Sequence, residues 1–279
     1  MKPLKTFFLT VFTLLVIASC KKEVDNTPTP INNNTADTCV LDTIKGPGDT
    51  LQWAFEYNTN GKISKQTYYS EGIPAEYTRV YYATNKVMVN DFGMDNQLIV
   101  TRVYNTGSNG LASTCVATYG EFKYSQVFHY DADEYLIRED ITTTKIHNGD
   151  TIIAAKGNTT FVITNNNVSS SIDSTFVRYK IGTDITTDSS LITETYEYRL
   201  DKAGLYAFIY NPTIIVPDLL GKSSKNLLSK STTIDNSVTK IRDYTYEFDS
   251  SGKAIKSTMN FSSSYYNFTQ VKFYNYSCK

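Results

Sequence analysis

The chain has two histidines, His129 and His147, which are its first candidates for metal binding or catalysis. Neither has a second His or a Cys within a few positions, as a zinc site would normally require. A Ser-His-Asp triad is assembled in space, so spacing does not exclude one, but no Gly-x-Ser-x-Gly sequence supports it. We therefore expect two surface histidines and predict neither a metal site nor catalytic residues.

Asp131, Asp133 and Glu134 place three carboxylates within four residues, a grouping that could attract calcium. The segment lacks the spacing and the glycine of a calcium loop, and it falls where a hairpin turn is expected, so we interpret it as a turn. No pair of acids can be named for glycoside hydrolysis, and no glycine-rich phosphate-binding motif occurs. The sequence predicts no cofactor; a hydrolase with acids or a serine brought together in space remains the alternative.

Cys20 is the residue with the most specific chemical signal. Lys2 and Lys5 precede a short apolar run, Phe7–Ile17, which is too short to span a bilayer and is typical of a signal peptide, here residues 1–19. Ile17-Ala18-Ser19-Cys20 resembles the bacterial lipobox. The resemblance implies diacylglyceryl transfer to the Cys20 thiol, cleavage before it and acylation of the new amine; two or three acyl chains would hold the chain at a membrane. Ordinary cleavage with a free thiol is the alternative.

Residues 20–38 comprise this cysteine and a polar stretch rich in Pro, Asn and Thr. Such a segment has few apolar side chains to offset the entropy lost on ordering, so we expect a flexible tether reaching roughly 20–25 Å. Lys21 is not the aspartate associated with inner-membrane retention of lipoproteins. The sequence therefore favours the outer membrane, facing either the periplasm or the cell surface.

The composition is tyrosine-rich and almost neutral. The 279 residues include 22 Tyr and 14 Phe, and the formal net charge is −1, which gives no electrostatic reason to expect a nucleic-acid partner. Tyrosine suits a sheet with one wet face, since its ring packs while its hydroxyl reaches water.

Tyr244–Thr258 shows the structural unit that recurs along the chain. Tyr244, Tyr246 and Phe248 share one parity and hence one face of a strand. Asp249 can accept a hydrogen bond from the backbone two residues on, and Gly252 can take the positive φ that closes a turn with a bulge.

Strand follows strand with short turns, and no helical period of ordinary length appears. We predict an all-β antiparallel meander of many hairpins, forming one large curved or barrel-like sheet as a single domain over residues 39–279. Asn211–Ser231 interrupts the rhythm at Pro212 and Pro217, with a short helical turn expected around Leu219 and Leu220. Predicted strands include 62–69, 77–82, 86–91, 97–104, 136–144, 151–155, 160–164, 175–181, 194–198, 205–210, 239–248, 254–261 and 271–276.

Three cysteines remain besides Cys20: Cys39, Cys115 and Cys278. In an oxidising compartment two of them are expected to pair. Cys39–Cys278 would close a very long loop, Cys39–Cys115 is nearly as plausible, and three reduced cysteines are the remaining alternative.

Several segments resemble the tyrosine–aspartate (Rhs-type) repeat. They are Tyr57-Asn58-x-Asn60-Gly61-Lys62-Ile63, Tyr130-Asp131-x-Asp133 and Phe248-Asp249-x-x-Gly252-Lys253. Together with the lipobox, Gly221–Leu227 and the closing Tyr274–Cys278, they make the chain similar to a family of bacterial lipoproteins of unknown function with a porin-like, curved β-meander fold. Glu134 departs from the pattern by replacing the turn glycine. The family supplies no catalytic residues.

The aromatic stripes have two interpretations. As core, Trp53, Phe55, Phe122, Phe128 and Phe248 would fill one face of the curled sheet. As a platform, aromatic residues could bind a glycan or a protein; Trp53, Tyr57 and Tyr130 are our candidates. A membrane-spanning barrel is disfavoured because Thr, Lys, Arg and Glu occur on both parities. We expect a lipid-anchored envelope protein with a non-catalytic binding or scaffolding role.

Overall fold

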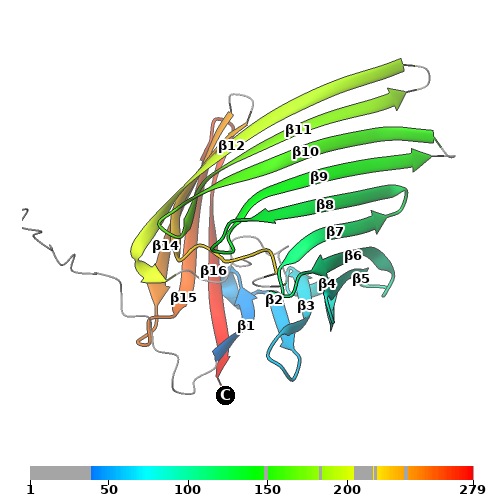
Figure 1. The fold of residues 1–279 in the computed structure, drawn as a ribbon. Helices are drawn as coiled ribbons and strands as arrows, with labels where there is room; N and C mark the ends of the chain where they lie inside the picture. The colour runs from blue at the N-terminus through cyan, green and yellow to red at the C-terminus, as the bar shows by residue number, and fades with distance from the viewer. Residues whose placement is uncertain are drawn as a thin grey trace, which may run out of the picture. The chain divides into compact units, whose positions relative to one another are not determined.

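A computed structural model describes residues 39–147, 150–181, 184–203, 216, 219–235 and 238–278 (Figure 1). Within them the regular structure is sixteen strands and one short 3-10 helix, η1 (Pro47–Asp49). The predicted signal peptide 1–19, the lipidation residue Cys20 and the tether 20–38 lie outside the described residues. The predicted strand 205–210, Pro212 and Pro217 do as well.

The strands are arranged in chain order around the sheet. Their bounds are β1 Cys39–Lys45, β2 Leu51–Tyr57, β3 Ile63–Ser70, β4 Ile73–Ala83, β5 Lys86–Gly93, β6 Leu98–Thr106, β7 Ala112–Tyr119, β8 Phe122–Tyr130, β9 Leu136–His147, β10 Asp150–Thr164, β11 Asn167–Ile181, β12 Asp184–Ala203, β13 Asn226–Asp235, β14 Val238–Phe248, β15 Ala254–Ser263 and β16 Asn267–Cys278.

Every strand pairs antiparallel with the next, and β1 pairs with β16, so the sheet closes into a barrel. This confirms the predicted all-β antiparallel meander. The seam runs from Cys39, opposite Cys278, to Lys45, opposite Phe273. Because each strand finds both neighbours within residues 39–278, the barrel is complete without the N-terminal segment, and we expect it to fold independently.

Five connections share one turn geometry, at residues 58–62, 93–97, 107–111, 131–135 and 249–253. At 249–253 the Asp249 carboxylate accepts hydrogen bonds from the backbone N–H groups of Ser251 and Lys253, and Gly252 has φ +84°. Glu134 takes the same left-handed conformation, φ +69°, in the turn that Asp131 caps. The predicted turns are thereby confirmed, including the one that lacks a glycine.

The turns at 58–62, 107–111, 131–135 and 249–253 lie at the end of the barrel where the chain enters and leaves, and the long β12–β13 connection leaves from this end too. Of that connection, residues 216 and 219–225 are described; we call them the luminal segment. Val216 and Leu219 join the buried core that the inward side chains of the wall form. We call this end the plugged end. Members of the core include Leu41, Ile44, Phe55, Ile63, Val80, Val87, Val89, Ala112, Cys115, Phe128 and Tyr274.

Six inward tyrosines, all on even-numbered strands near the plugged end, donate hydrogen bonds to backbone carbonyls of the preceding strand. In each acceptor strand, the residue that follows the accepting carbonyl is the extra residue of a β-bulge. The bulge interrupts the ladder of strand hydrogen bonds at this point. The tyrosine hydroxyl supplies the missing donor, which gives these residues a structural role. The pairs, at 2.6–2.9 Å, are Tyr57–Leu41, Tyr82–Ile63, Tyr130–Ala112, Tyr198–Val168, Tyr246–Leu228 and Tyr276–Ala254.

Three local predictions need correction. Gly157-Asn158 was expected to separate two strands, but β10 runs straight through both residues and pairs with β9 and β11. β7 and β13 were not predicted: the small side chains of β7 give no strong alternation, and the expected interruption Asn211–Ser231 covers the first six residues of β13, which pair with β12. Leu219 and Leu220 form a turn without a helix, and Leu219 N–H points to the Val216 carbonyl oxygen at 3.4 Å.

The outward face of the barrel carries charged side chains near the plugged end and also exposes apolar ones, among them Val116, Ile172 and Phe176. Cross-strand ion pairs join Lys65 to Glu56 at 2.9 Å and Lys256 to Glu247 at 2.6 Å. On β9, Arg138 pairs with Asp140 at 2.7 Å. Separately, no helix among the described residues is long and apolar enough to cross a bilayer.

Candidate functional site

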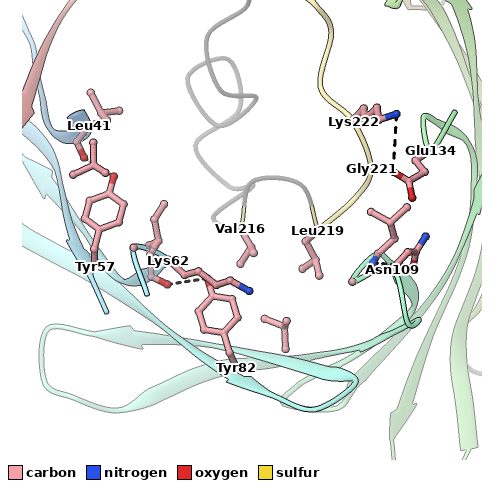
Figure 2. Close-up of a pocket in the computed structure, with 16 residues that line it drawn as sticks. Leu41, Tyr57, Lys62, Tyr82, Asn109, Glu134, Val216, Leu219, Gly221 and Lys222 are labelled. Atoms are coloured by element: carbon pink, nitrogen blue, oxygen red, sulfur yellow. Dashed lines mark hydrogen bonds and ion pairs between the residues drawn. The ribbon is translucent and has the colours of Figure 1, made fainter. Parts of the chain in front are cut away.

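A cavity of about 590 Å³ lies inside the plugged end, between the barrel wall and the luminal segment (Figure 2). Its volume falls within the roughly 300–1,000 Å³ typical of small-molecule sites. The wall contributes residues from β1 to β5 and from three turns. The lining residues are Val40, Leu41, Tyr57, Gly61, Lys62, Ile63, Tyr82, Val87, Asn109, Gly110, Leu111, Glu134, Val216, Leu219, Gly221 and Lys222.

Two tyrosines present their rings to the cavity because their hydroxyls are already engaged. Tyr57 donates to the Leu41 carbonyl oxygen at 2.6 Å, and Tyr82 donates to that of Ile63 at 2.9 Å. Burial raises the pKa of Tyr82 to about 12. With the aliphatic side chains of Leu41 and Val87, the rings form a mainly apolar wall.

The luminal segment is held against the wall by backbone hydrogen bonds. Ala112 N–H donates to the Leu219 carbonyl oxygen at 2.8 Å, and Lys222 N–H donates to that of Glu134 at 2.9 Å. Figure 2 shows Val216 and Leu219 extending from this segment toward the wall that carries Tyr82. The segment therefore forms one side of the cavity.

A buried pair of asparagines fixes the end of the luminal segment. Asn167 Nδ2 donates to Asn226 Oδ1 at 3.0 Å, and Asn226 N–H donates to Asn167 Oδ1 at 2.9 Å. Asn226 Nδ2 also reaches the carbonyl oxygens of Leu200 and Lys202. Because these buried amides are well satisfied, they set where β13 begins and hence where the segment leaves the lumen.

Among the described residues that line the cavity, the charged side chains are two lysines and one carboxylate, which sum to +1. Lys222 lies 4.0 Å from Glu134, with both side chains about half exposed. Lys62 has its ammonium 5.1 Å from the centre of the Tyr82 ring and has no carboxylate partner among the described ion pairs. The described lining thus combines apolar surface with a positive excess.

Of the three aromatic binding candidates, Tyr57 lines the cavity. Trp53 points into the barrel but packs on Tyr68, with ring centroids 4.7 Å apart. Tyr130 donates to the Ala112 carbonyl oxygen and lies under Gly221, so it supports the luminal segment from outside the cavity lining. Sequence reasoning missed Lys62, Leu111, Leu219 and Lys222, for which no local signal exists.

His129 lies on the outer wall, away from the cavity. Its Nε2 is 2.9 Å from Asp140 Oδ2, and Arg138 binds the other oxygen of that carboxylate. Hydrogen bonds from Arg138 and then His129 lower the pKa of Asp140. The side chain of His147 is outside the described part of the structure.

A disulfide joins Cys39 to Cys278, the pairing residues of the barrel seam, and Cys115 is buried as a free thiol. Burial raises the pKa of Cys115 to about 11, so at neutral pH the side chain is a protonated, weakly reactive thiol. The disulfide lies beside Val40 and Leu41, and hence next to the cavity.

Beyond the cavity the inward face becomes polar. Arg102 and Asp91 form an ion pair at 2.7 Å, and Gln126 Nε2 donates to Glu139 Oε1 at 2.6 Å. Burial raises the pKa of Glu139 and lowers that of Lys272. The inward face next to the cavity is therefore more polar than the cavity lining.

Two solved structures resemble the barrel. A porin-like protein from Bacteroides vulgatus ATCC 8482 aligns with a TM-score of 0.55 and 14% identity over 85% of this chain and 98% of that one. A porin-like protein from Bacteroides uniformis ATCC 8492 aligns with a TM-score of 0.50 and 16% identity, over 81% and 90%. No protein-family model and no curated protein matches the chain. At these identities the comparison establishes a shared porin-like fold.

Proposed function

We propose that this protein is a lipid-anchored component of the outer membrane, whose barrel stands in water and binds a small ligand, without catalysis, in the cavity at its plugged end. The cavity carries the proposal. It is a formed space of about 590 Å³, closed on one side by a segment that hydrogen bonds hold in place. Its described lining contains a single carboxylate, Glu134, so nothing there favours the hydrolase alternative.

The outer wall supports an aqueous barrel. Lys65–Glu56 and Lys256–Glu247 would be costly on a surface facing lipid. Residues 21–279, produced without the leader, should therefore remain in the supernatant after ultracentrifugation without detergent. Sedimentation or a requirement for detergent would mean that the barrel itself enters a bilayer.

The anchor is tested by labelling cells with radioactive palmitate. Wild-type protein should incorporate the label, and Cys20→Ala should not. Continued labelling of Cys20→Ala would show that Cys20 is not the attachment site. Partition of the labelled protein with the outer rather than the inner membrane tests its location.

Ligand binding in the cavity is tested with 1-anilinonaphthalene-8-sulfonate, a fluorescent probe with an apolar body. Residues 21–279 should bind it saturably at one site, and Leu111→Trp, which fills the cavity from the 107–111 turn, should abolish binding. Tyr119→Trp, at a position that is 49% exposed and lies at the end of β7 away from the cavity, is the matched control and should bind normally. Equal binding by both variants would place the probe elsewhere and remove the support for this function.

A second candidate function, glycan binding, is favoured by a cluster of rings at the opposite end of the barrel. Phe261, Tyr266 and Phe268 lie nearly parallel, with interplanar angles of 14–19°. Tyr266 is 59% exposed and its neighbour Tyr265 is 76% exposed. Such rings can stack on sugar faces. A glycan array with wild-type protein and Tyr266→Ala tests this; an array with no signal, or one that the substitution leaves unchanged, argues against it.

A further inference from the structure

We propose that the ligand of this cavity is an acyl chain with an anionic head group, a chemistry shared by free fatty acids and acidic phospholipids. This inference rests on the proposed binding function and specifies its ligand. Three features carry it: the mainly apolar walls, the lysines that border them, and the absence of free polar groups on the tyrosines that line the cavity.

The tyrosines argue for an aliphatic ligand. A cavity built for a sugar would offer several hydroxyl or amide groups for hydrogen bonding, whereas Asn109 is the one side-chain amide in the described lining. Here the hydroxyls of Tyr57 and Tyr82 are consumed by the carbonyl oxygens of Leu41 and Ile63. What faces the space is ring surface together with aliphatic side chains such as Val216 and Leu219. Burying an alkyl chain against such surface is favourable because it removes apolar area from water.

The lysines argue for an anionic head group. Lys62 comes from the β2–β3 turn and Lys222 from the luminal segment, so two elements bring positive charge to one space (Figure 2). Glu134 is 4.0 Å from Lys222 and offsets one charge, which leaves the ammonium of Lys62 without an acidic partner among the described ion pairs. A carboxylate or phosphate beside the ammonium of Lys62 would give this lysine an acidic partner, and Lys222 adds to the positive charge of the lining.

The test uses residues 21–279 and displacement of a fluorescent fatty acid by palmitate, by short-chain phosphatidylglycerol and by hexadecanol, which has the chain without the charge. Palmitate or phosphatidylglycerol should displace the probe. The compound that binds more tightly shows whether the ligand is a free fatty acid or an acidic phospholipid. The double variant Lys62→Gln, Lys222→Gln should bind the anionic compounds about fivefold more weakly, and its affinity for hexadecanol should equal that of the wild type. The double variant Lys65→Gln, Lys256→Gln, on the outer wall, is the matched control and should bind both the anionic compounds and hexadecanol as the wild type does.

The outcomes separate this inference from the function on which it rests. If the double variant affects palmitate and hexadecanol equally, the head group is not recognised and the proposal is wrong. If no acyl compound binds while Leu111→Trp still blocks 1-anilinonaphthalene-8-sulfonate, the cavity is a binding site for another class of ligand. If Leu111→Trp blocks nothing, both the ligand class and the binding function fail.

Discussion

Gly221 packs directly against the carbonyl oxygen of Glu134: a Cβ at position 221 would lie 2.6 Å from that oxygen and 3.0 Å from the Tyr130 ring. Its φ of +91° is also unfavourable for any other residue. The luminal segment can therefore approach the 131–135 turn closely enough for the Lys222 hydrogen bond only with glycine at this position. One glycine thus determines how the segment forms the wall of the cavity.

Gly221→Ala should consequently destabilise the barrel by about 2–4 kcal/mol, combining backbone strain with a backbone clash. Gly252→Ala is the matched control, because Gly252 has φ +84° but a Cβ at this position would meet nothing within 4 Å. It should cost only about 1 kcal/mol. Urea denaturation of both variants measures the difference, and equal losses would show that the close approach to Glu134 contributes little.

Tyr130→Phe tests the role of the tyrosines that bond to bulge carbonyls. Removing the hydroxyl leaves the Ala112 carbonyl oxygen without that donor, at a cost of about 1–3 kcal/mol. Tyr119→Phe, at a tyrosine that is 49% exposed, should change the unfolding free energy by less than about 0.5 kcal/mol. Unfolding midpoints that fall together for both variants would contradict a specific structural role for Tyr130.

Cys39→Ser combined with Cys278→Ser removes the covalent link across the seam. The disulfide closes a loop between residues 239 positions apart, so its loss should cost at most about 4–5 kcal/mol. The melting temperature of the wild type should fall to that of the variant when reductant is added, and the variant itself should not respond. If full reduction leaves the melting temperature of the wild type unchanged, strand pairing alone holds β1 and β16 together.

Stability should decline at alkaline pH because of the buried tyrosines. Burial raises the pKa of Tyr82 to about 12 in the folded protein, against about 10 in the unfolded chain. Above about pH 10 the unfolded state therefore loses this proton while the folded state retains it, and the unfolding free energy falls as pH rises toward 12. Urea midpoints measured between about pH 8 and 11.5 should decline less steeply for Tyr82→Phe. An identical slope in wild type and variant would exclude a contribution from Tyr82.

Local sequence patterns predicted the architecture because hairpin turns are encoded locally. Asp249 with Gly252, and Asp131 with its neighbours, specify turns within five residues, and the alternation of Tyr244, Tyr246 and Phe248 specifies which face packs. The same reasoning failed at Gly157-Asn158. A turn-forming pair can be carried in the middle of a strand when strands on both sides supply its hydrogen bonds.

The cavity could not be predicted because its parts come together only through closure. Lys62 and Lys222 are far apart in the chain. Both line the cavity only because the luminal segment, which sequence analysis recognised as an interruption, folds against the barrel wall. Tyr57 was named as a binding candidate for its aromatic character. Its hydroxyl bond to Leu41, which decides what it offers a ligand, depends on a bulge in a neighbouring strand.

The position of Cys39 gives the barrel a direction. Strand β1 starts at the plugged end, so the proposed tether would join the barrel at that end. The long hairpins of β9 to β12 would then project away from it (Figure 1). A molecule leaving a lipid layer would meet the cavity first, whereas one arriving from the surrounding fluid would meet the far rim with its aromatic rings. The plugged end and the far end of the barrel would thus be exposed to different molecules.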